Sequence, residues 1–184
     1  VDASGSHGLS CRRSAGRVAR HQYINDILWR AMHRANIPAV KEPTGLSRTD
    51  GKRPDGMTMV PWQEGRAALW DVTVRDTLAD SYIASTSLLA GSAAEEAARQ
   101  KEVKYSQLTG TYLFYAVAIE TLGPMCESGR TFISELGRRT AQVTSDKREI
   151  SFLFQRISVA VQRYNSVCIA GTFKDTASEP VDHG

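Results

Sequence analysis

The first strong pattern along the chain is helical and lies between residues 14 and 36. Apolar residues recur there at spacings of three and four, while arginines occupy other positions. The apolar positions are Val18, Ile24, Ile27, Leu28, Trp29, Ala31 and Met32. The segment therefore predicts an amphipathic helix that ends before Pro38.

Two strands are predicted next, after a linker over residues 38–52 that is rich in Pro, Gly and polar residues. The segment 53–62 (RPDGMTMVPW) sets Met57 and Met59 at alternating positions, which is the period of a strand. After the turn QEG, the segment 66–76 (RAALWDVTVRD) is rich in Val, Trp and Thr. The two segments together predict an antiparallel hairpin.

Helices dominate the rest of the chain, with one more strand among them. Residues 93–108 contain strong helix formers, whereas residues 111–121 are aromatic and β-branched, as is typical of a buried strand. Helices are also expected over 131–142 and 146–165. This order predicts an α/β fold with a small mixed β-sheet flanked by helices.

The composition fits one compact domain, since the chain has 184 residues and is 41% hydrophobic. No apolar run approaches the roughly 20 residues of a membrane span, and the first residues lack the pattern of a secretory signal. Three widely spaced cysteines, Cys11, Cys126 and Cys168, suit a reducing compartment. We therefore expect a nuclear or cytoplasmic protein that is not secreted.

Positive charge is concentrated near the start of the chain. Residues 11–53 contain ten Lys and Arg against three Asp and Glu, a surplus of +7, although the whole chain carries only +3. Such a segment is typical of contact with a polyanion, because neutralised phosphates release counterions. A solvated helix face is the alternative interpretation of the same charges.

Two aspartates carry the candidate chemistry. Asp55 stands at the start of the first predicted strand and Asp71 lies inside the second. Residues opposite each other in a hairpin lie about 5 Å apart, so the two carboxylates repel unless a cation lies between them. Mg²⁺ (or Mn²⁺) prefers oxygen ligands, activates bound water and stabilises charge on a phosphodiester. The pair therefore predicts metal-dependent hydrolysis of a nucleic acid.

Each aspartate also has a structural interpretation. Pro-Asp-Gly around Asp55 is an ordinary turn sequence. Asp71, in contrast, stands between Trp70 and Val72 in an apolar strand, where an unpaired carboxylate is costly to bury. Strand alternation sets Asp71 and Thr73 on the face opposite Val72. A functional interpretation is therefore favoured more strongly for Asp71 than for Asp55.

Three motifs together resemble a known family: RPD, then DVTV in the next strand, then KY in the following helix. They resemble the restriction-like endonuclease domain of site-specific non-LTR retrotransposons, a variant of the PD-(D/E)XK nuclease superfamily. The resemblance covers residues 11–173. It implies a restriction-endonuclease-like core over residues 14–173, preceded by a zinc-knuckle remnant over 1–13 and followed by an unstructured tail over 174–184.

The resemblance implies that the catalytic lysine comes from a helix. The standard superfamily motif places a lysine two residues after the second acid, where this chain has Thr73. In the retrotransposon branch the following helix supplies it, and Lys104 is the residue that matches. Lys101 lies one turn earlier, close to the same face. Tyr105, the neighbour of Lys104, is expected to form a hydrogen bond within the site or to pack beside it.

A third acid and a partner also follow from the resemblance. Glu42, in the approach to the hairpin, is the preferred third carboxylate, and Asp26 is the alternative. A nick in one DNA strand would expose a 3′ hydroxyl, on which a reverse transcriptase encoded upstream in the same polyprotein would prime. DNA and that reverse transcriptase are therefore the expected partners.

A smaller feature lies at the start of the sequence, where His7 and Cys11 are spaced like the closing half of a zinc knuckle. A structural Zn²⁺ needs four ligands. The resemblance therefore implies that two further cysteines lie upstream of Val1 in the full protein. An unstructured leader with an incidental histidine and cysteine is the alternative.

Basic residues around the first helix are candidates for contact with phosphates, giving affinity without sequence readout. These residues are Arg12, Arg13, Arg17, Arg20 and His21. Two rival functions remain open. One is a catalytically inactive, transposon-derived nucleic-acid-binding module, which Thr73 at the standard lysine position favours. The other is a structural or protein-interaction domain in which the aspartates only cap turns.

Overall fold

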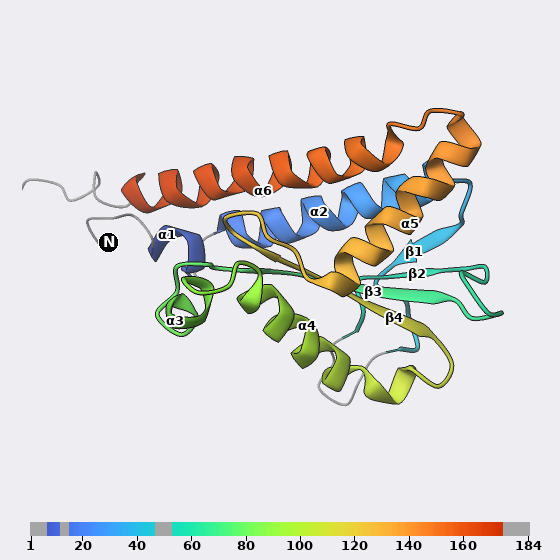
Figure 1. Cartoon of the computed structure of the whole chain (residues 1–184), viewed down its shortest axis with the longest axis horizontal. Helices are drawn as coiled ribbons and strands as arrows, with labels where there is room; N and C mark the ends of the chain where they lie inside the picture. The colour runs from blue at the N-terminus through green and yellow to red at the C-terminus, as the bar shows by residue number, and fades with distance from the viewer. Residues whose placement is uncertain (1–6, 12–14, 47–52, 175–184) are drawn as a thin grey trace, which may run out of the picture.

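A four-stranded sheet forms the centre of the molecule, and helices lie on both of its faces (Figure 1). The computed structural model describes residues 7–11, 15–46 and 53–174. Along the chain the elements are α1 (His7–Ser10), α2 (Ala15–Arg34), β1 (Ala39–Lys41), β2 (Gly56–Thr58), β3 (Ala68–Arg75), α3 (Ile83–Thr86), α4 (Ser92–Lys104), the 3₁₀ turn η1 (Ser106–Leu108), β4 (Leu113–Glu120), α5 (Glu127–Thr144) and α6 (Glu149–Lys174).

The sheet is mixed and has the strand order β1-β2-β3-β4. β2 pairs antiparallel with both β1 and β3, whereas β3 and β4 run parallel along their whole length. A parallel pair requires a crossover connection, and α4 makes it over one face of the sheet. The predicted α/β class, the antiparallel hairpin and the buried third strand are therefore confirmed.

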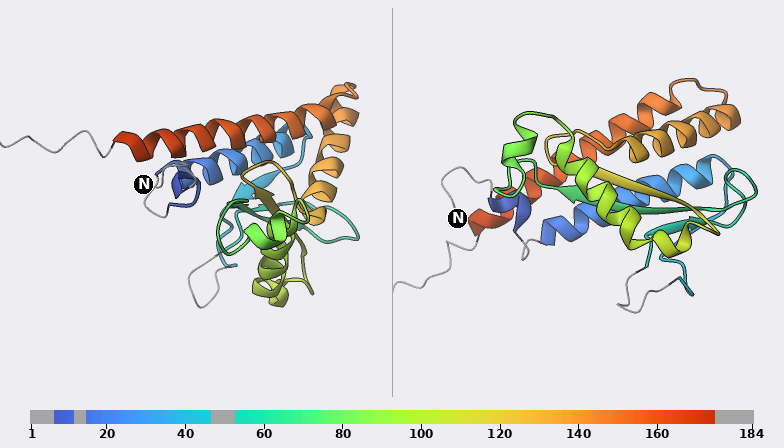
Figure 2. Two further views of the ribbon diagram at one scale, coloured as in Figure 1. Left: turned by 60° about the vertical axis from the view of Figure 1, so that its left-hand side comes forward. Right: turned by 60° about the horizontal axis from the view of Figure 1, so that its bottom comes forward.

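The helices divide into two layers. α2 and α6 run side by side on one side of the sheet, whereas α4 lies on the other (Figure 1 and Figure 2). α6 packs against α2 and α5, and α2 packs against β1 and β3. The larger hydrophobic core lies between the sheet and the layer of α2, α5 and α6.

Strand alternation assigns the residues of β3 and β4 to these two layers. Trp70, Val72, Val117 and Ile119 belong to the larger core. Toward α4, β4 presents Ala116 and Ala118, which pack against alanines of the helix: Ala94, Ala97 and Ala98. Because small residues face each other there, α4 lies close to the sheet.

Glu120 at the end of β4 fixes the start of α4. Its Oε1 accepts hydrogen bonds from the main-chain N–H groups of Ala93 at 2.9 Å and Ala94 at 3.3 Å. A carboxylate at this position satisfies donors that the first turn of a helix leaves unpaired and complements the helix dipole. The crossover helix is therefore anchored at its N-terminal end to the strand it leads into.

Among the predicted segments, two differ most from the structure. The linker predicted over 38–52 contains β1, which is too short at three residues to show an alternating pattern. The last helix continues to Lys174 instead of ending near residue 165. Its later part packs closely on α2, since a Cβ at Gly16 would lie 2.7 Å from Cys168 Sγ. In the described part of the chain, no helix is long and apolar enough to cross a membrane.

A substitution at Gly56 tests the packing of the hairpin. A Cβ at this position would lie 1.9 Å from Cζ2 of the buried Trp70 ring. Gly56→Ala is therefore expected to lower the free energy of unfolding by about 1–3 kcal/mol through overpacking, as measured by urea denaturation. Gly110→Ala is the matched control, because no atom lies within 4 Å of its added Cβ. Equal stability of the two variants would contradict the described packing.

Candidate active site

Asp71 lies on the face of the sheet that α4 covers. Its neighbours Trp70 and Val72 point into the larger core on the other face, as the alternation of β3 requires. Asp71 is only 3% exposed. A carboxylate buried to this degree needs charged or hydrogen-bonding partners, and α4 supplies them.

Asp55 lies near Asp71, on the chain segment directly before β2. The register of β2 and β3 sets Gly56 against Trp70, so Asp55 adjoins the part of β3 around Asp71. The main-chain N–H of Asp55 donates to Trp70 O at 3.0 Å. Asp55 Oδ2 accepts from the main-chain N–H of Val72 at 2.6 Å. Asp55 is therefore positioned by contacts with β3 and not by a turn alone.

Lys101 reaches Asp71 from the last turn of α4. Its Nζ forms an ion pair with Asp71 Oδ2, and the two side chains are 21% and 5% exposed, respectively. The C-terminal turn of a helix favours cations, because the unpaired carbonyl groups there carry partial negative charge. The helix therefore supplies a compensating charge at the point where the sheet buries a carboxylate.

Tyr105 joins the two segments that carry the aspartates. Its hydroxyl donates to the main-chain O of Arg53 at 2.9 Å and lies 3.3 Å from Asp71 Oδ1. Lys104 Nζ donates to the Tyr105 hydroxyl oxygen at 2.6 Å. Of the two predicted lysines, Lys101 thus contacts the carboxylate itself, whereas Lys104 contacts the tyrosine beside it.

Two polar residues of α2 hold Asp55 from the other side. His21 Nε2 lies 2.9 Å from Asp55 Oδ2, and Asn25 Nδ2 donates to Asp55 O at 3.1 Å. Asn25 Oδ1 also accepts from Trp70 Nε1 at 2.8 Å. The sequence predicts a DNA contact for His21 but not its bond to Asp55. It predicts no role for Asn25. The available signal was a polar pair four residues apart on a largely apolar side of the helix.

The electrostatics of the site reflect the two close carboxylates. Burial raises the pKa of Asp71 and the Asp55 charge raises it further, whereas Lys101 opposes both. The hydrogen bond to Asp55 raises the pKa of His21, although burial opposes this. His21 therefore adds stability below its unfolded pKa of about 6.5, and the contribution disappears as the pH rises through the folded pKa.

The two aspartates fit a hard divalent cation. Mg²⁺ binds commonly through one or two carboxylates, with waters and substrate phosphates completing its shell. A cation between Asp55 and Asp71 would offset the repulsion that contributes to the raised pKa of Asp71. Within residues 7–11, 15–46 and 53–174, no group of three or more His, Cys, Asp and Glu side chains is arranged to hold a metal. Coordination would therefore depend on the two carboxylates, water and substrate.

The other predicted acids bind basic side chains. Glu42 has a positive φ of 47°, and its main-chain N–H donates to Asp55 O at 3.0 Å. Its carboxylate is turned to Arg53 and is 61% exposed. The Asp26 carboxylate forms an ion pair with Lys41. Glu42 thus lies beside Asp55 through its backbone, while its carboxylate points to another partner.

Arg20, which was predicted to contact phosphates, is buried and has partners within the protein, although it also lines a cavity with Arg17 and His21. Arg20 is 2% exposed. It donates to Asn165 Oδ1 at 2.6 Å and to Leu9 O at 3.4 Å, so it ties α6 and α1 to α2. Its role in the fold is therefore to join three helices.

Arg17 is more exposed than Arg20 and is therefore better placed for the predicted phosphate contact. It is half-buried and lines a cavity of about 470 Å³ together with His21 and Thr73. Arg12 and Arg13 lie outside the described residues. The predicted partial zinc site falls at α1, where His7 begins the helix and the half-buried Cys11 follows it.

Comparison with known protein families and with curated proteins finds no match for this chain. The geometry of the site is therefore the main guide to its chemistry.

Lys101→Met tests the charge balance of the site. The substitution keeps most of the side-chain volume but leaves the buried Asp71 without its cation, so a loss of about 3 kcal/mol in the free energy of unfolding is expected at pH 7. The loss should shrink at low pH, where Asp71 takes up a proton. Urea denaturation at several pH values measures both effects.

Arg99→Met is the control, because it breaks the ion pair of Arg99 with Glu96 on the exposed side of the same helix. Its stability should match the wild type. Adding Asp71→Asn to Lys101→Met should recover part of the lost stability, since it removes the uncompensated charge. A Lys101→Met variant as stable as Arg99→Met at pH 7 would refute the proposed charge balance.

Proposed function

We propose that this chain is a metal-dependent DNA endonuclease domain with a restriction-endonuclease-like core. The observation that carries the proposal is the proximity of the Asp55 charge to the buried Asp71 carboxylate, with Lys101 bound to Asp71. The order of elements supports the core: α2, then β1, β2 and β3, then the crossover helix α4 and the parallel strand β4. The reaction is hydrolysis of a phosphodiester bond that nicks one DNA strand.

Each residue of the site has a role in this proposal. Asp55 and Asp71 hold Mg²⁺ or Mn²⁺, which lowers the pKa of the attacking water and stabilises the phosphate charge when bound. Lys101, at the same carboxylate, neutralises the charge that develops as water attacks phosphorus. His21 keeps Asp55 in place by donating Nε2–H to its carboxylate. Tyr105 holds the main chain at Arg53, two residues before Asp55.

The position of Lys101 supports an active centre despite Thr73. Thr73 occupies the strand position at which the standard superfamily motif has its lysine. An ammonium from α4 reaches Asp71 instead. Thr73 lines the cavity of about 470 Å³ beside His21 and Arg17, which offers a substrate phosphate an approach to Asp55.

The proposed substrate and context follow from charge and resemblance. The surplus of +7 over residues 11–53 favours a polyanion, and Arg17 at the cavity wall is placed to contact a phosphate. In a retrotransposon polyprotein, the nick would provide a 3′ hydroxyl for the upstream reverse transcriptase, in the nucleus. The second candidate is an inactive, transposon-derived nucleic-acid-binding module, which the missing strand lysine at Thr73 favours.

Cleavage of supercoiled plasmid tests the proposal. The wild-type chain is expected to convert the plasmid to the nicked form with Mg²⁺ or Mn²⁺ and not with EDTA. Asp55→Asn and Asp71→Asn should lower the rate by about a hundredfold or more, because each removes a metal ligand. Lys101→Ala should lower it by about a hundredfold, and Lys104→Ala by less, since Lys101 forms an ion pair with Asp71 whereas Lys104 donates to Tyr105.

Lys147→Ala is the control for loss of a lysine, because Lys147 is exposed and precedes α6. It should leave the rate unchanged. Nicking by the Asp71→Asn variant at the wild-type rate would rule out the proposed mechanism. Plasmid binding without metal-dependent nicking would favour the inactive binding module instead.

A further inference from the structure

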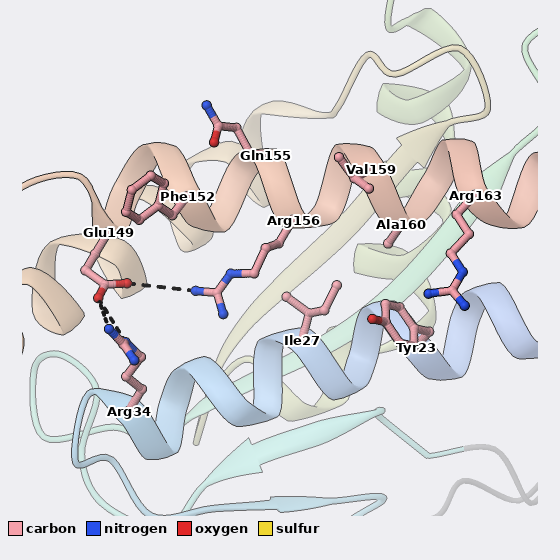
Figure 3. A pocket seen from close by; sticks show the side chains of 10 residues that line it. All are labelled: Tyr23, Ile27, Arg34, Glu149, Phe152, Gln155, Arg156, Val159, Ala160 and Arg163. Carbon is pink, nitrogen blue, oxygen red and sulfur yellow. Dashed lines mark hydrogen bonds and ion pairs between the residues drawn. The ribbon is translucent and has the colours of Figure 1, made fainter.

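A second cavity, of about 570 Å³, forms a groove along α2 and α6 (Figure 3). The two helices run antiparallel, because Tyr23 near the start of α2 packs on Tyr164, while Arg34 at its end pairs with Glu149. The groove shares no described lining residue with the cavity beside His21. It is therefore a separate surface from the candidate active site.

The floor of the groove is apolar. Ile27 of α2 and Ala160 of α6 line it, and Val159 and Phe152 are 66% and 37% exposed. On α6 the lining extends over the 15 residues from Glu149 to Arg163, or about 21 Å along the helix axis. An exposed apolar stripe of this length with polar ends is typical of an interaction surface.

Three arginines line the groove. Arg163 stands at one end, beside Tyr23, Arg34 stands at the other, and the Arg156 side chain lies between Glu149 and Ile27 (Figure 3). Glu149 is 2% exposed and pairs with both Arg34 and Arg156. Arg163 forms no ion pair within the described part of the chain. The groove therefore carries net positive charge, with one cation available at its Arg163 end.

The chemistry of the lining favours a polypeptide over a nucleic-acid strand. Single-stranded nucleic acids need aromatic rings on which bases stack and cations that follow the phosphates. Of the two aromatic rings in the described lining, Tyr23 already packs on Tyr164, with centroids 5.3 Å apart, and Phe152 is covered by the Arg148 guanidinium at 5.2 Å. In the middle of the groove, the aliphatic side chains of Ile27 and Val159 lie beside Gln155 and Arg156 (Figure 3). A valley between two helices with an apolar floor suits a third helix that presents its own apolar stripe.

We propose that this groove binds an amphipathic helix of a partner protein, whose apolar stripe packs on Val159 and Ile27 and whose flanking acidic residues pair with the arginines at the two ends. Acidic flanks would complement the charge of the groove, because its lining contains three arginines and one glutamate, which is buried. Arginine and aromatic residues around an apolar centre are also the composition enriched at protein interfaces. This surface is independent of the nuclease reaction.

A peptide library tests the proposal. Helical peptides of about 16 residues, or four to five turns, are displayed with a fixed apolar stripe and with Glu, Lys or Ser at the flanking positions. Selection against the full chain is expected to enrich Glu at the flanks. Fluorescence anisotropy with the best peptide should give saturable binding, and its counterpart with Lys in place of Glu should bind about tenfold more weakly or worse.

Binding measurements on variants then locate the peptide-binding site on the molecule. Val159→Glu and Arg163→Glu should each weaken binding by about tenfold or more. Val143→Glu on α5 is the matched control, because Val143 is 47% exposed and lies outside the groove. It should bind as the wild type does, and so should the Asp71→Asn variant. Circular dichroism confirms that each variant is folded.

Several results would overturn the proposal. They are failure to select any binder, enrichment of Lys at the flanks, and binding that Val159→Glu leaves unchanged. Competition by a single-stranded DNA oligonucleotide that is lost in Val159→Glu would assign the groove to nucleic acid instead. Plasmid nicking is scored separately, so a failure of the nuclease proposal does not alter the outcome here.

Discussion

The ion pair between Asp71 and Lys101 is the interaction on which the candidate site depends. Asp71 stands in the buried part of β3, between Ala68 and Val72, so its carboxylate has lost most of its contact with water. Burial and the neighbouring Asp55 raise its pKa. A buried charge without a partner costs several kcal/mol, whereas a paired one is tolerated. The position of α4 therefore matters for stability as well as for chemistry.

The rest of the fold brings α4 to that position. Facing alanines on α4 and β4 allow the helix to lie close to the sheet. Glu120 anchors the first turn of the helix, and Tyr105 ties its last turn to the segment of Asp55. The parallel pairing of β3 with β4 requires this crossover. The helix that completes the sheet thus also delivers the lysine.

Much of the fold could be predicted from the sequence because its periodic signals are strong. The helix from residue 15, the hairpin with Asp71 and the alanine-rich crossover helix each have the spacing of the element that forms. β1 was missed, since three residues between loops show no period. The end of α6 was missed as well, because small residues such as Cys168 pack there without an apolar stripe.

The candidate site could be predicted in part. The hairpin predicts the two aspartates, but it does not predict which lysine contacts Asp71. Lys101 and Lys104 both lie near one helical face, and only the angle at which α4 crosses the sheet decides which of them meets Asp71. Arg20 belongs to a basic segment of the sequence, yet it is buried by contacts with residues far along the chain. Such contacts depend on tertiary packing, which spacing along the chain does not encode.

The central claim is that Asp55 and Asp71 together bind a divalent cation. Anomalous diffraction from crystals soaked in Mn²⁺ tests it most directly, because the ion's position is then measured against both carboxylates. The account predicts a single strong anomalous peak between the Asp55 and Asp71 carboxylates, and none in crystals of Asp71→Asn. A peak elsewhere, or no peak at this pair, would contradict it.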